Sequence, residues 1–302
     1  MASPGSTLVE ANLFAAKVDQ ATLFRRLYCL EPMTDSISDP TPAQPLTVDQ
    51  AIANLSDPDT SLRYYAAWWL GRFQVKDPAA VTALLVALKD EDDRTELGGY
   101  PLRRNAARAL GKLGDQRAVE PLRQCLSCAD FYVREAAARS LGSLGDRRVV
   151  PDLQALIATG WEAAQSVPGR PHLAQPCEAV LEALGDLGAT DAIAAVEVFL
   201  DHPLERLRYA AHRAMYQLTR SPDYGERLVE ALSGADLQLR RVALSDLGAV
   251  GYLPAAPMIA QAAVESSFRL FALKGLLDYA LDTEPADSTV PQNIMAWMDS
   301  LL

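Results

Sequence analysis

The sequence predicts an all-α solenoid of about six helix pairs, and three observations support this fold class. One pattern recurs along the chain, as in LRYYAAWWLGRF from Leu62, LRRNAARALGKLG from Leu102, VREAAARSLGSLG from Val133 and LRRVALSDLGAVG from Leu239. Each copy carries a small residue and, four positions on, a leucine or methionine, and these fall on one face of a helix. A second helical stretch follows each copy, such as PAAVTALLVALKD or VVPDLQALIATG. Recurrence of one helix pair every 31 residues or so is typical of a solenoid.

The columns of the repeated pattern have structural explanations. Small residues that let neighbouring helices approach fill one column: Ala66, Ala106, Ala137, Val180, Ala211, Ala243 and Ala272. Glycines that suit the positive φ of a helix C-terminus follow at Gly114, Gly145, Gly188 and Gly251. Arginines fill a third column, and acids such as Asp59, Asp130 and Asp236 precede several of them. We interpret this third column as a structural Asp–Arg ladder and the helix pairs as HEAT-like repeats.

The repeats divide the chain into three parts. The HEAT-like solenoid is predicted to occupy residues 46–282, and residues 283–302 are predicted to form a C-terminal cap or tail. Residues 1–45 form an N-terminal extension and linker, in which EPMTDSISDPTPAQP reads as the linker. Met33 would serve as a natural start, so a chain beginning there is expected to fold and to keep its activity.

Composition excludes several classes of function. The formal net charge of −11 argues against nucleic acid as a partner. No apolar run reaches the eighteen or so residues of a transmembrane segment, and no signal peptide is evident. The chain has 4 cysteines, of which Cys125 and Cys128 form a single CxxC motif. Without a second pair of ligands this motif predicts no metal site, and we interpret both residues as packing residues of a helix.

Two inserts interrupt the regular spacing of the arginine column, which is 40 residues from Arg63 to Arg103 and 31 from Arg103 to Arg134. The first insert lies in KDEDDRTELGGYP and the second in TGWEAAQSVPGRPHLAQP. Both are expected on one rim of the solenoid, two repeats and therefore roughly 20 Å apart. They offer candidate binding residues: Asp92, Asp93, Arg94, Glu96 and Tyr100 in the first, and Trp161, Arg170 and His172 in the second. The alternative is that the inserts are solvated loops that cover a groove.

Aromatic residues set the first copy apart. Trp68 stands in a column that is polar in six other copies, and Tyr64 in one that is mostly polar, so both are predicted to face a ligand or partner. Trp69 stands in a column of small residues and is predicted to fill space, while Tyr65 is predicted to face the core. The alternative is that this copy packs against the N-terminal segment. His202 is predicted to be solvated and His212 to be packed.

No catalytic triad, P-loop or dinucleotide fingerprint is present, so residue chemistry alone predicts a binding scaffold. However, SLRYYAAWWLGRF, DEDDRTELGGYPLRRNAARALGKLGD, DFYVREAAARSLGSLGD and VPGRPHLAQPCEAVLEALG together resemble the E-type subunits of the E/F phycobilin lyases. The resemblance is strongest to lyases that attach phycocyanobilin to the α subunit of phycocyanin, and it covers roughly residues 46–250.

The resemblance implies a cytoplasmic cyanobacterial protein of photosynthesis, near phycobilisomes, that forms a heterodimer with an F-type subunit. The heterodimer would join a linear tetrapyrrole through a thioether to a cysteine of the phycocyanin α subunit. No cofactor is expected, and phycocyanobilin would be a bound substrate. Arginines would hold its propionates, carboxylates its pyrrole nitrogens and Trp68 or Tyr64 its rings, with His172 or Tyr100 as candidate proton donors. The alternative is a non-catalytic scaffold or chaperone for phycobilisome assembly.

Overall fold

The computed structural model describes residues 46–302, and the predicted N-terminal extension and linker lie outside the described residues. The first helix of the described residues is α2 (Val48–Asn54), and helix pairs follow it. The first helices of the pairs are α3 (Thr60–Arg72), α5 (Pro101–Leu113), α7 (Phe131–Leu144), α9 (Cys177–Asp186), α11 (Glu205–Thr219), α13 (Leu237–Val250) and α15 (Ser266–Thr283). The second helices are α4 (Pro78–Ala87), α6 (Val119–Cys125), α8 (Val150–Ile157), α10 (Ile193–Glu197), α12 (Pro222–Glu230), α14 (Ala256–Gln261) and α16 (Val290–Asp299).

Short 3₁₀ helices connect or extend these elements. They are η1 (Gln116–Ala118), η2 (Arg147–Val149), η3 (Gly160–Ala164), η4 (Thr190–Ala192), η5 (Ala231–Ser233) and η6 (Leu253–Ala255). Residues 46–302 contain no strand beyond one isolated bridge between Ser166 and Leu173, so the all-α prediction is confirmed.

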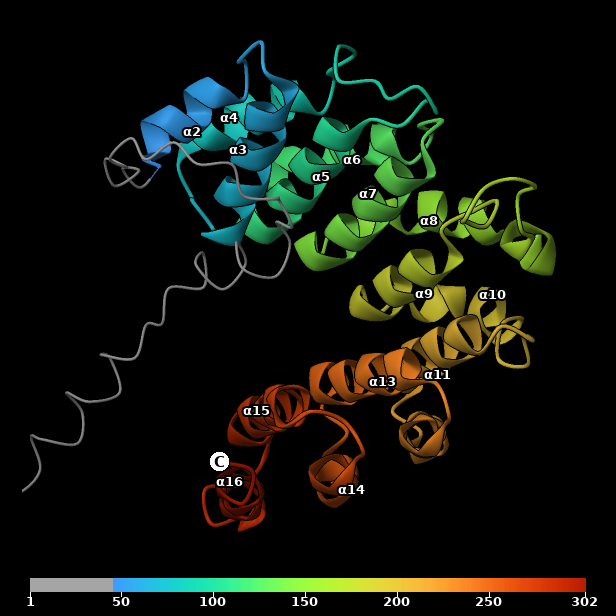
Figure 1. Ribbon diagram of the computed structural model, residues 1–302. Helices are drawn as coiled ribbons and strands as arrows, with labels where there is room; N and C mark the ends of the chain where they lie inside the picture. Colours follow the sequence, from blue (N-terminus) through green and yellow to red (C-terminus); the bar gives the residue numbers. More distant parts are fainter. Residues whose placement is uncertain (1–45) are drawn as a thin grey trace, which may run out of the picture. The chain divides into compact units, whose positions relative to one another are not determined.

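The helix pairs stack in the order of the sequence, so that each first helix packs against the next one (Figure 1). Six pairs run from α3 and α4 to α13 and α14, which confirms the predicted solenoid of about six pairs. At the C-terminal end α15 packs on α13, and α16 packs on both α15 and α14. The core lies between the layer of first helices and the layer of second helices, and Leu70, Leu110, Leu141 and Leu184 are fully buried in it.

Two columns of glycine make this stacking possible. Gly145 has a φ of 76° and ends α7 in the left-handed conformation, as the sequence predicts for its column. A second column, which the sequence analysis missed, brings helix backbones together. A Cβ atom added at Gly142 of α7 would lie 2.8 Å from the Cα of Ala183 in α9, so only glycine fits at this crossing.

The predicted Asp–Arg ladder is wrong in its partners, although both columns are structural. The aspartates cap helices instead: the Asp130 side chain accepts a hydrogen bond from the Tyr132 N–H at 2.8 Å. The arginines bind backbone carbonyl groups of the preceding segment. Arg134, for example, donates to the Cys128 carbonyl oxygen at 2.7 Å, and it also reaches the Ala174 carbonyl oxygen of the later insert at 2.9 Å. A guanidinium group has several donors, and here they satisfy the carbonyls that a helix end leaves open.

The position of α3 at the start of the series explains a further correction. Tyr65 was predicted to face the core, yet 48% of it is exposed. In the later copies the same column is covered by the preceding first helix, as at Asn105, which is 4% exposed. Within residues 46–302 no first helix precedes α3, so Tyr65 lacks that cover.

Candidate functional site

The two inserts meet at one edge of the solenoid. The first lies between α4 and α5, and the second lies between α8 and α9. Arg170 of the second insert donates a hydrogen bond to the Leu97 carbonyl of the first at 3.1 Å. The expected separation of roughly 20 Å is therefore wrong, because both loops bend towards each other across the edge of the intervening repeat.

In the first insert, Asp93 and Tyr100 take part in contacts that hold the backbone in place. The Asp93 carboxylate accepts from the Leu102 N–H at 3.0 Å and so caps the start of α5; burial raises the pKa of this carboxyl. The Tyr100 N–H donates to Asp130 at 2.7 Å. The Tyr100 ring lies 4.1 Å from the guanidinium of Arg103 and 5.7 Å from that of Arg94, which are cation–π contacts.

The two other candidate carboxylates of this insert, Asp92 and Glu96, remain open to solvent. The Asp92 side chain is 81% exposed and lies 3.7 Å from Arg63. Glu96 is exposed as well. These two residues have the access that a binding role requires, whereas Asp93 is committed to the helix terminus.

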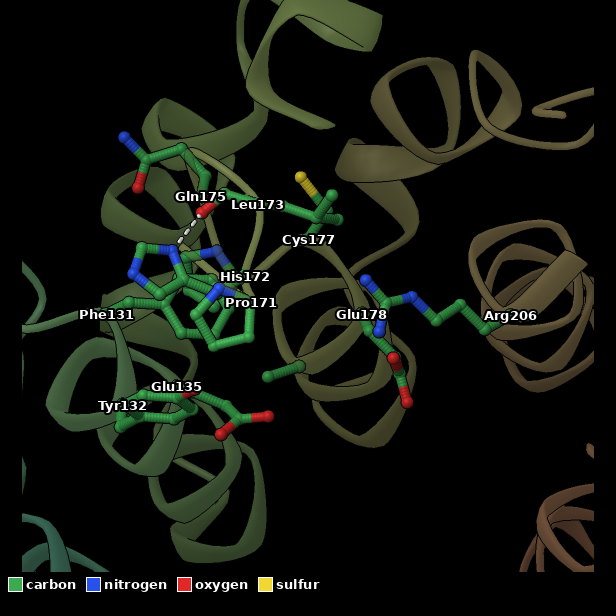
Figure 2. A pocket seen from close by; sticks show the side chains of 12 residues that line it. Phe131, Tyr132, Glu135, Pro171, His172, Leu173, Gln175, Cys177, Glu178 and Arg206 are labelled. Carbon is green, nitrogen blue, oxygen red and sulfur yellow. Dashed lines mark hydrogen bonds between the residues drawn. The ribbon is translucent and has the colours of Figure 1, made fainter. Parts of the chain in front are cut away.

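In the second insert, His172 forms one wall of a cleft between α7 and α9 (Figure 2). Its ring stacks on Phe131, with centroids 4.5 Å apart and planes within 8°, and meets Tyr132 edge-on at 5.8 Å. The His172 Nδ1 atom lies 2.8 Å from the Leu173 carbonyl oxygen. This contact requires a proton on Nδ1, so Nε2 of the neutral ring is the acceptor.

This cleft, which we call the His172 cleft, has a volume of about 130 Å³. Besides the aromatic rings it is lined by Glu135, Glu178, Cys177 and Arg206, and Figure 2 shows the Arg206 side chain extending into it from α11. Burial raises the pKa of the Cys177 thiol to about 12, so this sulfur stays protonated and is a poor nucleophile.

Three guanidinium groups near the His172 cleft are in no ion pair, and one of them, Arg134, is already bound to backbone carbonyls. Most arginines on the first helices are paired: Arg139 lies 3.0 Å from Glu182, and Arg213 lies 2.9 Å from Asp186. In the part of the chain that the structure describes, no ion pair involves Arg206 or Arg104. Arg104 instead lies 5.7 Å from the Tyr132 ring. Both groups are therefore available for an anionic ligand.

The remaining aromatic candidates lie elsewhere. Trp161 donates its indole N–H to the Val198 carbonyl at 2.7 Å and meets His202 edge-on, with 49% of its surface exposed. His202 was predicted to be solvated, but it is only 4% exposed, because the Trp161 and Phe199 rings cover it. Its Nδ1 accepts from the Leu204 N–H at 3.1 Å, which is incompatible with a free, solvated ring.

On α3, Tyr64 is 38% exposed and Trp68 is 43% exposed, and the Trp68 ring packs on Tyr65 at 5.5 Å. The prediction of a polar, solvent-facing column holds for Arg108, whose side chain is 50% exposed, but not for Arg213, which is buried. Neither Tyr64 nor Trp68 lines the His172 cleft.

The structure therefore separates the two candidate proton donors. His172 lies in its own cleft, whereas Tyr100 lines a different cleft with Arg103 and the CxxC motif. Sequence reasoning missed Tyr132, Arg104 and Arg206; the adjacent aromatics of DFYVRE, directly after a capping aspartate, were the signal available. Within residues 46–302 no group of three or more His, Cys, Asp or Glu residues is placed to hold a metal ion, and no helix there is long and apolar enough to cross a membrane.

Comparison with known proteins defines the class. HEAT repeats match residues 100–166, and the PBS lyase HEAT-like repeat matches residues 62–90. The phycocyanobilin lyase subunit alpha of Nostoc sp. is 58% identical over 85% of this chain and 94% of its own length. The subunit of the same name from Thermosynechococcus vestitus is 60% identical over 85% of this chain and 95% of its own length. The fold and these matches define a HEAT-repeat protein of the bilin lyase class.

A solved structure narrows the class. It is described as the complex of CpcE and CpcF of phycocyanin lyase from Nostoc sp., and it matches with a TM-score of 0.81 and 59% identity. The match covers 90% of this chain and 100% of that one. The chain belongs to the family of phycocyanobilin lyase alpha subunits.

Proposed function

We propose that this chain is the alpha subunit of a phycocyanobilin lyase and works as a heterodimer with an F-type subunit. The pair joins phycocyanobilin through a thioether to a cysteine of the phycocyanin α subunit, in the cytoplasm of a cyanobacterium. Support comes from the names of the relatives, which share 58% and 60% identity over most of both chains, and from the two-subunit complex that matches by structure. No second function has a comparable observation behind it.

We infer that the His172 cleft contacts the bilin, which is a bound substrate. The observation that carries this inference is the pairing of an aromatic wall with unpaired cations. Phe131, Tyr132 and His172 offer flat faces to conjugated rings, and Arg206 extends into the same space without a carboxylate partner. Propionates and pyrrole rings are the groups that such a wall and cation recognise.

In the attachment reaction the protein orients the two reactants and supplies one proton. The thiol of the acceptor cysteine adds its sulfur to the ethylidene carbon, and a proton is delivered to the conjugated system. Holding both reactants in register contributes most of the acceleration. The imidazolium form of His172 donates from Nε2, because its Nδ1–H is held by the Leu173 carbonyl. The buried Cys177 thiol remains a spectator.

Reconstitution tests this proposal. The chain is co-expressed with an F-type subunit, the apo phycocyanin α subunit and a source of phycocyanobilin, and covalent pigment is measured after denaturation. His172→Gln keeps a polar side chain but removes the proton donor, so we expect binding of bilin with a lower rate of attachment. Arg206→Gln is expected to weaken bilin binding instead.

The matched control is Arg227→Gln, which removes a surface arginine that is paired with Glu230 on α12 and lies outside the cleft. Absence of pigment with all components folded and the bilin supplied contradicts the lyase function and favours a scaffold. Full activity of both cleft variants contradicts only the placement of the bilin.

A further inference from the structure

The CxxC motif closes the second helix of one repeat. Cys125 is the last residue of α6, and Cys128 follows it across the turn formed by Leu126 and Ser127. The interpretation of both cysteines as packing residues of a helix is therefore wrong for Cys128, which lies beyond the helix end. Both thiols are free and half-buried. The proposed lyase chemistry uses neither of them, because the acceptor cysteine belongs to phycocyanin.

The local backbone brings the two residues within bonding distance. The Cys128 N–H donates to the Cys125 carbonyl at 3.1 Å, which closes a four-residue turn. The ends of such a turn lie less than about 7 Å apart between Cα atoms. Disulfides form at Cα separations of about 4.4 to 6.8 Å, so this turn allows a bond without remodelling of the helix.

The two sulfur atoms have different surroundings. Burial, and then the charge of Cys128, raise the pKa of the Cys125 thiol to about 11. Cys128 lines two clefts, with Arg103 in one and Arg134 in the other, whereas Cys125 lines only the first. Burial slows the reaction of a thiol. The more accessible Cys128 is therefore the first sulfur to react, and Cys125 is the second.

Cys128 is also accessible from two sides. One cleft, of about 320 Å³, is lined by Cys125, Cys128, Tyr100 and Arg103. A second, of about 660 Å³, reaches Cys128 beside Arg134 and Gln175. A small oxidant can thus reach this sulfur, while the fully buried Cys177 is shielded.

We propose that Cys125 and Cys128 form a peroxide-sensitive dithiol site. The Cys128 thiolate attacks hydrogen peroxide, the O–O bond breaks, and hydroxide leaves, which gives a sulfenic acid at Cys128. The Cys125 sulfur then attacks this sulfenic acid, water leaves, and a disulfide forms. Peroxide is the two-electron oxidant, and the two thiols are oxidised to one disulfide.

The turn that carries the site also holds both inserts. Arg134 binds the Cys128 carbonyl and, at the same time, the Ala174 carbonyl of the second insert. Two residues after Cys128, Asp130 accepts from the Tyr100 N–H of the first insert at 2.7 Å. A disulfide that tightens this turn shifts both anchors. Oxidation therefore lowers bilin attachment, a consequence that rests on the proposed function.

Mass spectrometry of the full chain tests the chemistry without any lyase assay. Cleavage after Arg123 and Arg134 places both cysteines in one tryptic peptide, QCLSCADFYVR. After hydrogen peroxide treatment we expect this peptide to lose two hydrogen atoms and to resist alkylation, with recovery on adding dithiothreitol. Cys125→Ser is expected to trap the sulfenic acid, which dimedone labels at Cys128. Cys128→Ser is expected to leave Cys125 unlabelled, and Cys177→Ser is the control that should leave oxidation of this peptide unchanged.

Persistence of two alkylatable thiols under peroxide overturns the proposal, as does dimedone labelling at position 125 rather than 128. In the heterodimer, oxidation is expected to lower pigment attachment several-fold in the wild type and not in Cys125→Ser or Cys128→Ser. Equal loss in all three chains overturns the link to the inserts. Lack of attachment by the reduced wild type is a failure of the lyase function instead, and the peptide experiment does not depend on it.

Discussion

Replacement of Trp68 by arginine separates a ligand-facing indole from a structural one. Arginine already occupies this column at Arg108, Arg139 and Arg213, so the substitution introduces a side chain that the fold accepts in three other repeats. The matched control is Trp69→Ala. Trp69 is the neighbouring indole, but it packs against the core and lies 5.0 Å from the Phe73 ring.

The structure predicts different losses of folding stability for the two variants. Trp68 is 43% exposed, and the aliphatic stem of arginine covers part of the same surface. Trp68→Arg therefore loses the ring contact with Tyr65 and a small buried area, which lowers the free energy of unfolding by about 1 kcal/mol or less. Trp69 is partly buried against the core, and replacement of a core tryptophan by alanine typically costs about 3 kcal/mol.

Thermal and urea denaturation of the two variants measure these free energies, and bilin binding with F-subunit association is measured on the same samples. We expect Trp68→Arg to stay folded and to lose binding clearly, and Trp69→Ala to lose stability first. Unfolding of Trp68→Arg as severe as that of Trp69→Ala contradicts the assignment and makes the aromatic cluster an end cap. A stable Trp68→Arg chain with normal binding and transfer contradicts it equally.

Three further predictions test the geometry. Gly142→Ala places a Cβ atom 2.8 Å from the Ala183 Cα, so we expect the free energy of unfolding to fall by about 1 to 2 kcal/mol in urea denaturation. The neighbouring control Ser143→Ala is expected to leave it unchanged. A Gly142→Ala chain as stable as the wild type refutes the close crossing. Burial raises the pKa of Asp246 from 3.8 to about 7, so between these pH values the folded chain holds a proton that the unfolded chain has lost. The free energy of unfolding should therefore fall as pH rises from about 4 to about 7. Asp246→Asn should remove this pH dependence, and an unchanged dependence in that variant contradicts the prediction. Arg170→Ala removes the contact with the Leu97 carbonyl, so proteolysis of the second insert should become faster while the melting temperature stays within about a degree or two of the wild type. Equal proteolysis rates in the two chains count against the contact.

Asp246 illustrates why such a slope is expected despite an ion pair. Its carboxylate lies 3.2 Å from the Nε atom of Arg213, yet that Nε makes no aligned hydrogen bond. Arg213 also forms an ion pair with Asp186 at 2.9 Å, and the negative charge of Glu182 opposes ionisation of Asp246. One buried cation shared among several carboxylates does not offset the desolvation of each of them.

The repeated columns predicted the solenoid well, because each column reports one contact that recurs at every helix crossing. Glycine at position 145 predicted a left-handed helix end, and the structure has a φ of 76° there. Column patterns could not reveal the partner of a side chain with several donors. Arg134 was assigned to an aspartate, but it binds three carbonyls of the turn and insert around it.

The candidate site was harder to predict because inserts have no period. Spacing located both loops but said nothing about their direction, so the contact from Arg170 to the Leu97 carbonyl was not foreseen. His172 was identified by its chemistry alone. Its neighbour Tyr132 was missed because it sits within a regular copy, where an aromatic side chain is easily read as packing.

The aromatic residues of α3 show why an end effect explains one tryptophan and not the other. In interior helices the column of Trp69 is small, because a glycine of the preceding helix lies against it, as Gly71 does at Ala109 and Gly142 at Ala183. Within residues 46–302 α3 has no such predecessor, so a large ring at position 69 fills the vacated space. Position 68 differs, because its column holds exposed charged side chains at Arg108 and Arg139, which pair with glutamates on the next helices. Within the described residues no neighbouring backbone limits size there, so an end effect does not account for the indole. Contact with a ligand or partner stays the prediction for Trp68, and Trp68→Arg tests it.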